Sequence, residues 1–262
     1  MSADDIYSMI VETENVHEIR ADRNLCIGPP EAKHMSGGAC VAHILQCLEV
    51  DVGRPIIAAN AQFLKAPSLG RTARIGVQVL HEGRSISQVR ATMKVDDSDA
   101  VTVTAALGAR PDIGSHRWAV APVVSPPLEC QRIPFVREDP GDLHTNLDMR
   151  MAVDERGSPA GRFVSWIKAP NCDHVPASFL ALVADYLPEA INLNIGRRAG
   201  ATSLDNTIRI IARDQTDWLL CETNLDGIEN GLFHGRMSIF SQDGVLMAHA
   251  SQSGVVHLLP SR

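Results

Sequence analysis

Aromatic residues make up only 4% of this 262-residue chain, so its core must come mainly from Val, Ile, Leu, Ala and Met. No apolar stretch approaches the roughly 18 residues that a membrane-spanning helix needs. The N-terminal sequence MSADDIYSMIVETEN is acidic and lacks the basic and apolar regions of a signal peptide. We therefore expect a cytoplasmic protein with no role at a membrane.

The chain also lacks a dense run of Lys and Arg, and its formal net charge is −7. Both features argue against a general nucleic-acid-binding protein. No C-x-x-C pair or H-E-x-x-H motif indicates a metal site, and we expect no metal or redox cofactor. The G-x-S-x-G motif of a serine hydrolase is missing as well. Six cysteines are scattered through apolar segments, which is typical of reduced, buried thiols.

The two halves of the chain show the same order of elements. The segment GGACVAHILQCLEV, from Gly37, predicts a helix with an apolar face. Four strand-like segments follow it, at residues 55–67, 73–80, 89–95 and 100–108. In the second half a helix from Pro176 precedes four more, at residues 203–213, 217–223, 232–240 and 245–259. The repeat predicts an internal duplication.

Residues 109–160 separate the halves and contain seven prolines and few periodic runs. Because Pro lacks the amide hydrogen that a sheet ladder needs, we expect a connector laid over the surface. The chain then divides into an N-terminal unit (1–110), this connector (111–160) and a C-terminal unit (161–262).

An apolar helix followed by a meander of strands predicts an α+β fold in which an antiparallel sheet wraps around its own helix. Two copies in one chain would form a pseudo-dimer. Their sheets could join edge to edge, which would also remove exposed strand edges. The alternative architecture is two separate α+β domains on a flexible linker.

One residue stands out in the helix predicted from Pro176. The stretch FLALVADYLPEA carries Asp185 one turn before Pro188 would end the helix. The ordinary interpretation is a solvated face, shared with Ser178 and Glu189. The other interpretation is a functional acid.

Several segments resemble the acyl-CoA thioesterase II family, whose members carry two hot-dog folds in one chain. They are HMSGGACVAHIL, AQFLKAP and HEGRSISQVR in the first half, and VADYLPEAI, TSLDNTIRI and DGVLMAHASQSGVV in the second. Their order and spacing make the resemblance fairly specific. It implies a double hot-dog fold, hydrolysis of an acyl-CoA substrate, and a homodimer or larger assembly.

The resemblance also implies three site residues that position the attacking water. They are Asp185 on the second helix, Ser203 near the start of the following strand, and Gln252 on the last strand. Thr202, beside Ser203, leaves the identity of the hydroxyl open. Two positions depart from the family pattern: Ser203 stands where Thr is frequent, and Ser253 where an acidic residue is common.

Hydrolysis of a thioester needs an activated water and stabilisation of the oxyanion that forms on the carbonyl oxygen. A carboxylate that accepts the proton of the water typically contributes about 10²–10⁴-fold. Backbone N–H groups at a helix start can bind an oxyanion, and Gly37 and Gly38 fit that need. The alternative is that these glycines only permit close packing. Where the second helix carries Asp185, the first offers Gln46 and Glu49, so we expect one site per chain.

The nucleotide end of CoA is polyanionic, and a local basic patch could bind it. The candidates are Lys65, Arg71, Arg74, Arg84, Arg90, Arg197 and Arg198. The turn His81–Arg84 is expected near the substrate groove.

Three alternative functions remain open. A Cys40 nucleophile beside His43 would need the two side chains to meet, although both have the pattern of core residues. A hot-dog enoyl-CoA hydratase would need a histidine close to Asp185. A non-catalytic acyl-CoA-binding protein would bind acyl-CoA and release no thiol.

Overall fold

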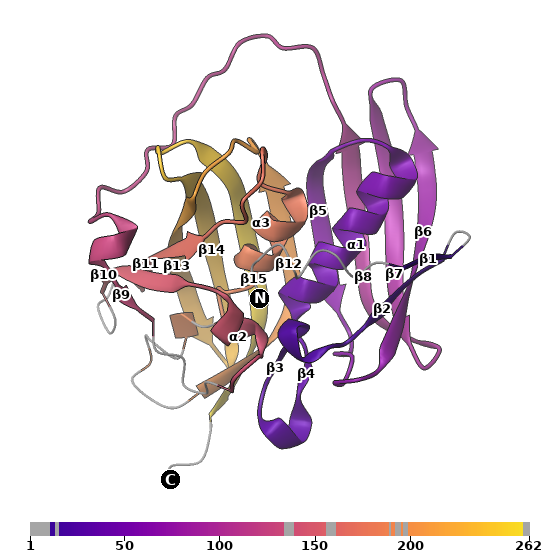
Figure 1. The fold of residues 1–262 in the computed structure, drawn as a ribbon, viewed down its shortest axis with the longest axis horizontal. Coiled ribbons are helices and arrows are strands. Elements are labelled where there is room, and N and C mark those ends of the chain that lie inside the picture. Colours follow the sequence, from indigo (N-terminus) through magenta and orange to yellow (C-terminus); the bar gives the residue numbers. More distant parts are fainter. Residues whose placement is uncertain are drawn as a thin grey trace.

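The computed structural model describes residues 11–13, 16–133, 139–155, 161–188, 190–191, 195 and 199–258. Within them no helix is long and apolar enough to cross a membrane. One large antiparallel sheet dominates the molecule, and two helices, α1 and α3, lie side by side on the same face of it (Figure 1).

The N-terminal half builds one end of this sheet around α1 (Gly37–Val52). Its four long strands are β5 (Ile56–Phe63), β6 (Thr72–Glu82), β7 (Ile86–Val95) and β8 (Ser98–Gly108). Its shorter elements are β1 (Val11–Thr13), β2 (Val16–Arg20), η2 (Arg23–Leu25), β3 (Cys26–Ile27), η3 (Pro30–Ala32) and β4 (His34–Met35).

The C-terminal half builds the other end around α3 (Ala177–Ala184). Its long strands are β12 (Ala199–Ile210), β13 (Trp218–Glu229), β14 (Leu232–Ser241) and β15 (Leu246–Leu258). Before α3 come η4 (Pro127–Glu129), β9 (Gln131–Arg132), α2 (Leu143–Asn146), β10 (Met149–Asp154) and β11 (Arg162–Lys168). The predicted order of a helix and four long strands is therefore present twice.

The two halves join through a continuous ladder. The strand order is β1-β2-β6-β7-β8-β5-β12-β15-β14-β13-β11-β10-β9, with β5 antiparallel to β12 at the centre. Asn60 lies opposite Thr207, and their side chains share a hydrogen bond of 2.6 Å between Asn60 Nδ2 and Thr207 Oγ1. This edge-to-edge pairing confirms the predicted pseudo-dimer and rules out two separate domains on a flexible linker.

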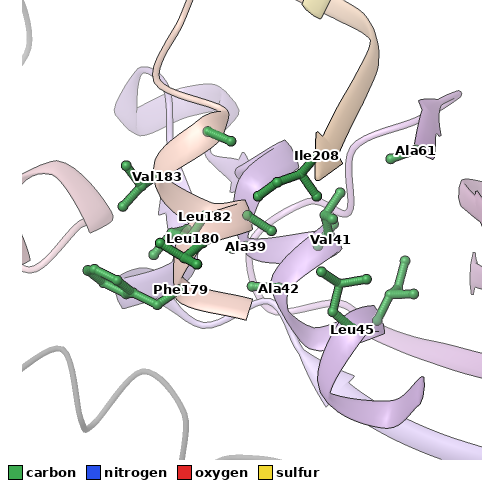
Figure 2. Packing of buried hydrophobic residues seen from close by; sticks show 14 of the residues in the cluster. Ala39, Val41, Ala42, Leu45, Ala61, Phe179, Leu180, Leu182, Val183 and Ile208 are labelled. Carbon is green, nitrogen blue, oxygen red and sulfur yellow. The ribbon is translucent and has the colours of Figure 1, made fainter. Parts of the chain in front are cut away.

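Local sequence explains where α1 begins and ends. Ser36 caps its start, with the side-chain Oγ accepting the N–H of Ala39 at 3.0 Å. Gly53 ends it in the left-handed conformation, at φ 64°. Apolar side chains of α1 and α3 then pack together beneath the sheet; Figure 2 shows Ala39, Ala42, Leu180 and others of this cluster.

The helix α3 is shorter than the sequence predicted. It ends at Ala184, and Asp185 is its C-cap, with φ −83° and ψ 3°. The prediction that Asp185 lies inside the helix is therefore wrong by one position. The last turn tightens through bonds from the N–H groups of Asp185 and Tyr186 to carbonyls three residues earlier. As a result, Asp185 projects from the helix end.

The segment between the halves has two parts. Residues 109–126 carry no helix or strand and arch from β8 toward the far end of the sheet (Figure 1). Ala121 and Val124 pack on the outer face of the C-terminal sheet, where Trp166 Nε1 donates to Ser125 O at 2.9 Å. Beyond residue 126, the short strands β9 and β10 extend the sheet next to β11. The periodicity of the sequence had not predicted these strands or α2.

Candidate active site

The three predicted site residues meet at one point, where α1 begins and α3 ends. Gln252 Nε2 donates to Asp185 Oδ1 at 2.6 Å, and the hydroxyl of Ser203 donates to the same oxygen at 3.4 Å. Gln252 Nε2 also lies 2.7 Å from Ser203 Oγ. The backbone N–H of Gly38 donates to the other carboxylate oxygen, Asp185 Oδ2, at 2.6 Å. The cluster draws on both halves of the chain.

A β-bulge aims Ser203 at Asp185. The pairing of β12 with β15 changes register between Ser203 and Asp205. Before the bulge the odd-numbered residues of β12 face the helices, and after it the even-numbered ones do, starting with the buried Asn206. The neighbouring Thr202 instead places its Oγ1 3.0 Å from His257 Nε2. Of the two candidate hydroxyls, only that of Ser203 is bonded to Asp185 in the described structure.

The glycines at the start of α1 allow the two helices to approach closely. A Cβ added to Gly38 would lie 2.7 Å from Leu182 O and 2.8 Å from Asp185 Cβ. One added to Gly37 would lie 2.8 Å from the ring of Phe63. Both positions therefore exclude a side chain. The close packing still leaves the backbone N–H of Gly38 able to act as a donor, since it binds the Asp185 carboxylate.

The environment of Asp185 shifts its titration toward neutral pH. Burial raises the pKa of this carboxyl to about 6, and the hydrogen bonds from Gln252, Gly38 and Ser203 act in the opposite direction. The N-terminus of the 16-residue helix α1 also favours the ionised form. Asp185 is thus a carboxylate that can gain and lose a proton close to physiological pH. The solvated-face interpretation is wrong for it, and also for Ser178, which is buried; Glu189 lies outside the described residues.

A cavity of about 320 Å³ opens beside this cluster. Asp185, Ser203 and Gly37 are part of its wall. At its mouth lie the exposed Leu64 and Lys65, whereas its deeper wall is apolar and buried. That deeper wall includes Met35, Cys40, Val101, Leu143 and Leu182. The site therefore combines a polar corner with an apolar compartment.

Two ring-bearing residues of this wall had not been predicted. Tyr186 and His144 line the cavity with their rings in an edge-to-face arrangement, centroids 5.6 Å apart. Tyr186 could have been noticed as one of few aromatic residues, directly after Asp185. His144 has no periodic context, because α2 is only four residues long.

The predicted basic patch is not a single surface. Lys65 lies at the cavity, whereas Arg71 pairs with Asp96 and Arg74 Nε pairs with Glu18 Oε1 at 2.9 Å. Arg90 is exposed on β7, and Arg197 and Arg198 lie outside the described residues.

The turn that contains Arg84 was expected near the groove, and this prediction is wrong. Gly83, in that turn, accepts from Arg54 Nη1 at 2.9 Å, next to the C-terminal end of α1. The cavity is at the opposite, N-terminal end of the 16-residue helix. The antiparallel hairpin carries its turn away from the site.

The first half carries a different arrangement at the end of its own helix. Glu49 Oε1 accepts from the N–H of Ile56 and from Arg213 Nη1, each at 2.8 Å. This carboxylate is held by an arginine, unlike Asp185, which no cation in the described residues pairs with. Gln46 Oε1 is buried and has no hydrogen-bond partner among the described residues.

The geometry disfavours a cysteine nucleophile. His43 Nδ1 lies 2.7 Å from Ala39 O, one turn earlier in α1. Burial raises the pKa of the Cys40 thiol, and the charge of Asp185 raises it further. A thiolate at Cys40 is therefore disfavoured, although this residue reaches the cavity wall.

Residues 29–108 match the family model of the acyl-CoA thioesterase N-terminal domain, and residues 127–256 match that of the C-terminal domain. Comparison with the curated proteins finds no match.

Solved structures share the fold over nearly the whole chain. A protein of Novosphingobium aromaticivorans, described provisionally as a thioesterase, is 28% identical with a TM-score of 0.88, covering 97% of this chain and 100% of its own. An acyl-CoA thioesterase II of Mycobacterium marinum is 18% identical with a TM-score of 0.76, covering 96% of each chain. A hot-dog protein of unknown function from Alicyclobacillus acidocaldarius is 21% identical with a TM-score of 0.83, covering 100% of each. With both halves matched by the family models, the chain belongs to the acyl-CoA thioesterase family of thioester hydrolases, and its fold is the double hot-dog.

Proposed function

We propose that this protein hydrolyses acyl-CoA thioesters with Asp185 as the general base. The observation that carries the proposal is the convergence of Gln252, Ser203 and Gly38 on one carboxylate at the wall of a cavity. All three groups donate to Asp185, two to Oδ1 and one to Oδ2, so they fix its orientation and leave one lone pair, on Oδ2, for a water. With a pKa of about 6, the carboxylate is mostly ionised at neutral pH and can accept a proton.

In the proposed reaction, a water bonded to Asp185 attacks the thioester carbonyl carbon. Asp185 takes one proton from this water as the new C–O bond forms. Ser203 and Gln252 hold the carboxylate, and thereby the water, at a defined angle. Collapse of the tetrahedral intermediate breaks the C–S bond and releases the free acid. The sulfur keeps the bonding electrons and takes the proton from Asp185, so CoA leaves as the thiol and the carboxylate is restored.

The oxyanion requires a donor that the carboxylate does not already occupy. The N–H of Gly38 is engaged with Asp185, so we assign Gly38 to holding the base. Gly37 lies in the cavity wall, and no other described residue accepts its N–H. At the positive end of α1, this N–H is the donor that suits the developing oxyanion.

Free-thiol release tests the proposal against its alternatives. Incubation with a panel of acyl-CoAs should release CoA in many turnovers per chain. A non-catalytic binding protein would bind acyl-CoA stoichiometrically and release no thiol. A hydratase would lower the absorbance of crotonyl-CoA without release of CoA. Either of the last two results would overturn the proposed function.

A further inference from the structure

The short helix α2 forms part of the deep wall of the cavity. Its first residue, Leu143, is 1% exposed, and both Leu143 and His144 line the cavity. The helix packs against η2 and β3 of the other half of the chain (Figure 1). A helix of four residues is too short to be stable by its own hydrogen bonds. Its position therefore depends on the contacts that surround it.

An ionic cluster links α2 to the N-terminal half. Lys33 Nζ lies 3.3 Å from Asp142 Oδ2 and 3.0 Å from Asp139 Oδ2. The side chains of Lys33 and Asp142 are each only 2% exposed. Arg23 Nη2 completes the cluster at 2.6 Å from Asp139 Oδ1, so two positive charges balance two negative ones.

The Asp142 carboxylate performs two tasks at once. Its Oδ1 accepts the N–H of Thr145 at 3.2 Å, which caps the start of α2. Its Oδ2 binds the ammonium of Lys33. The same side chain therefore begins the helix and ties it to the opposite half of the chain.

The residues that follow the two partners line the same cavity from the two halves of the chain. Lys33 directly precedes His34 and Met35 of β4, which line it from one half. Asp142 directly precedes Leu143, which lines it from the other half. The Lys33–Asp142 pair, whose side chains are both buried, thus joins two walls of the cavity.

This deep wall is uncharged where it meets the cavity. Met35, Leu143 and Leu182 are each at most 1% exposed. Burial lowers the pKa of the neighbouring His144, which is therefore a neutral imidazole at pH 7. An apolar end behind a polar corner suits the tail of an acyl chain. The volume of about 320 Å³ is near the lower limit of small-molecule pockets, roughly 300–1,000 Å³.

We propose that α2 closes the acyl pocket and that Leu143 limits the length of the acyl chain, with Lys33 and Asp142 as positioning residues that hold it there. The proposal rests on the proposed function, since it takes the cavity to be the acyl pocket. The ion pair does not need to add stability, because well-packed apolar residues often replace a buried pair at no loss. Its role here is to fix one position of α2.

The test measures binding, so it does not depend on turnover. The probes are S-alkyl-CoA thioethers of increasing length, from S-propyl to S-hexadecyl, titrated by calorimetry into the full-length protein. While the chain still fits, each added methylene should strengthen binding about fourfold. Once the alkyl chain is longer than the pocket, further methylenes should no longer strengthen binding. We call the chain length at which the affinity stops rising the break. In Leu143→Ala, the break should move to chains longer by about three carbons, the number of atoms removed.

Two further variants separate positioning from general damage. Leu147→Ala removes the same atoms from a side chain that is 2% exposed and outside the cavity wall, so the wild-type break should stay. Lys33→Met combined with Asp142→Asn removes both charges and keeps a good helix cap, and should blur the break or move it to longer chains.

The results test the role of α2 and Leu143 separately from the proposed hydrolysis of acyl-CoA. An unchanged break in Leu143→Ala, or a wild-type protein whose affinity rises steadily to S-hexadecyl, would overturn the assignment of α2. Absence of thiol release from acyl-CoAs, with the break present and movable, would overturn the hydrolase function and leave the pocket assignment standing.

Discussion

The N–H of Gly38 donates a hydrogen bond of 2.6 Å to Asp185 Oδ2, joining residues 147 positions apart in the chain. The start of the first helix thereby holds the carboxylate at the end of the second. Neither half of the duplicated chain can build this contact alone. The duplication therefore explains why one chain carries a composite site whose parts come from two repeats.

Substitution of Gly38 should disturb this contact directly. In Gly38→Ala the new methyl group would meet Leu182 O at 2.7 Å and Asp185 Cβ at 2.8 Å, and neither can move without shifting α3. Overpacking of this kind destabilises by about 1–3 kcal/mol. We expect a lower urea midpoint and a loss of turnover. Gly200→Ala, with no atom within 4 Å of the new methyl, is the matched control and should match wild type.

The pH dependence of turnover should report the titration of Asp185. Because burial raises its pKa to about 6 and the base must be ionised, kcat/KM should fall about tenfold per pH unit below pH 6. Above it, kcat/KM should be level. A profile that is flat from about pH 5 to pH 8 would show that the rate does not depend on this carboxylate.

Gln252 should lower the pKa at which Asp185 titrates. Its hydrogen bond of 2.6 Å stabilises the ionised carboxylate and lowers the pKa of Asp185. Gln252→Met keeps an unbranched side chain of similar size and removes the donor. The acid limb of kcat/KM should move to a pH above that of wild type, and the plateau should drop about 10–100-fold. A lower plateau with an unmoved limb would show damage to packing alone.

The raised pKa of Asp185 should also make the free energy of unfolding depend on pH. The native state keeps a proton on Asp185 between about pH 4 and pH 6, where the unfolded chain has already lost it. Ionisation of the buried carboxyl therefore destabilises the native state. The free energy of unfolding falls as pH rises through that interval. Urea denaturation should show wild type losing about 2 kcal/mol relative to Asp185→Asn between pH 4 and pH 7. Parallel pH dependence of the two proteins would contradict the burial of this charge.

Periodicity was sufficient to predict α1, the long strands and their duplication, because each has a regular apolar pattern. It could not predict α2 or β9, since four and two residues are too short for any period. Asp142, a good capping residue just after Gly141, was the one local signal for α2.

The site itself depended on contacts between distant residues. The resemblance selected Asp185, Ser203 and Gln252, but no local pattern indicates that a β-bulge turns Ser203 inward. Nor does one indicate that Lys33 and Asp142, 109 positions apart, bind each other in the interior. Tertiary packing, which local propensity does not encode, decides these relationships.

The most direct test compares thiol release by wild type, Asp185→Asn and Asp205→Asn on one acyl-CoA panel. Asp205 is a suitable control because it is close in the chain to Ser203, and its Oδ1 accepts only the N–H of Ser253, at 2.7 Å, among the described contacts. We predict that Asp185→Asn loses about 10²–10⁴-fold in turnover while it still folds and binds acyl-CoA, and that Asp205→Asn stays near wild type. Wild-type rates in a folded Asp185→Asn protein would contradict the role of Asp185 as the base.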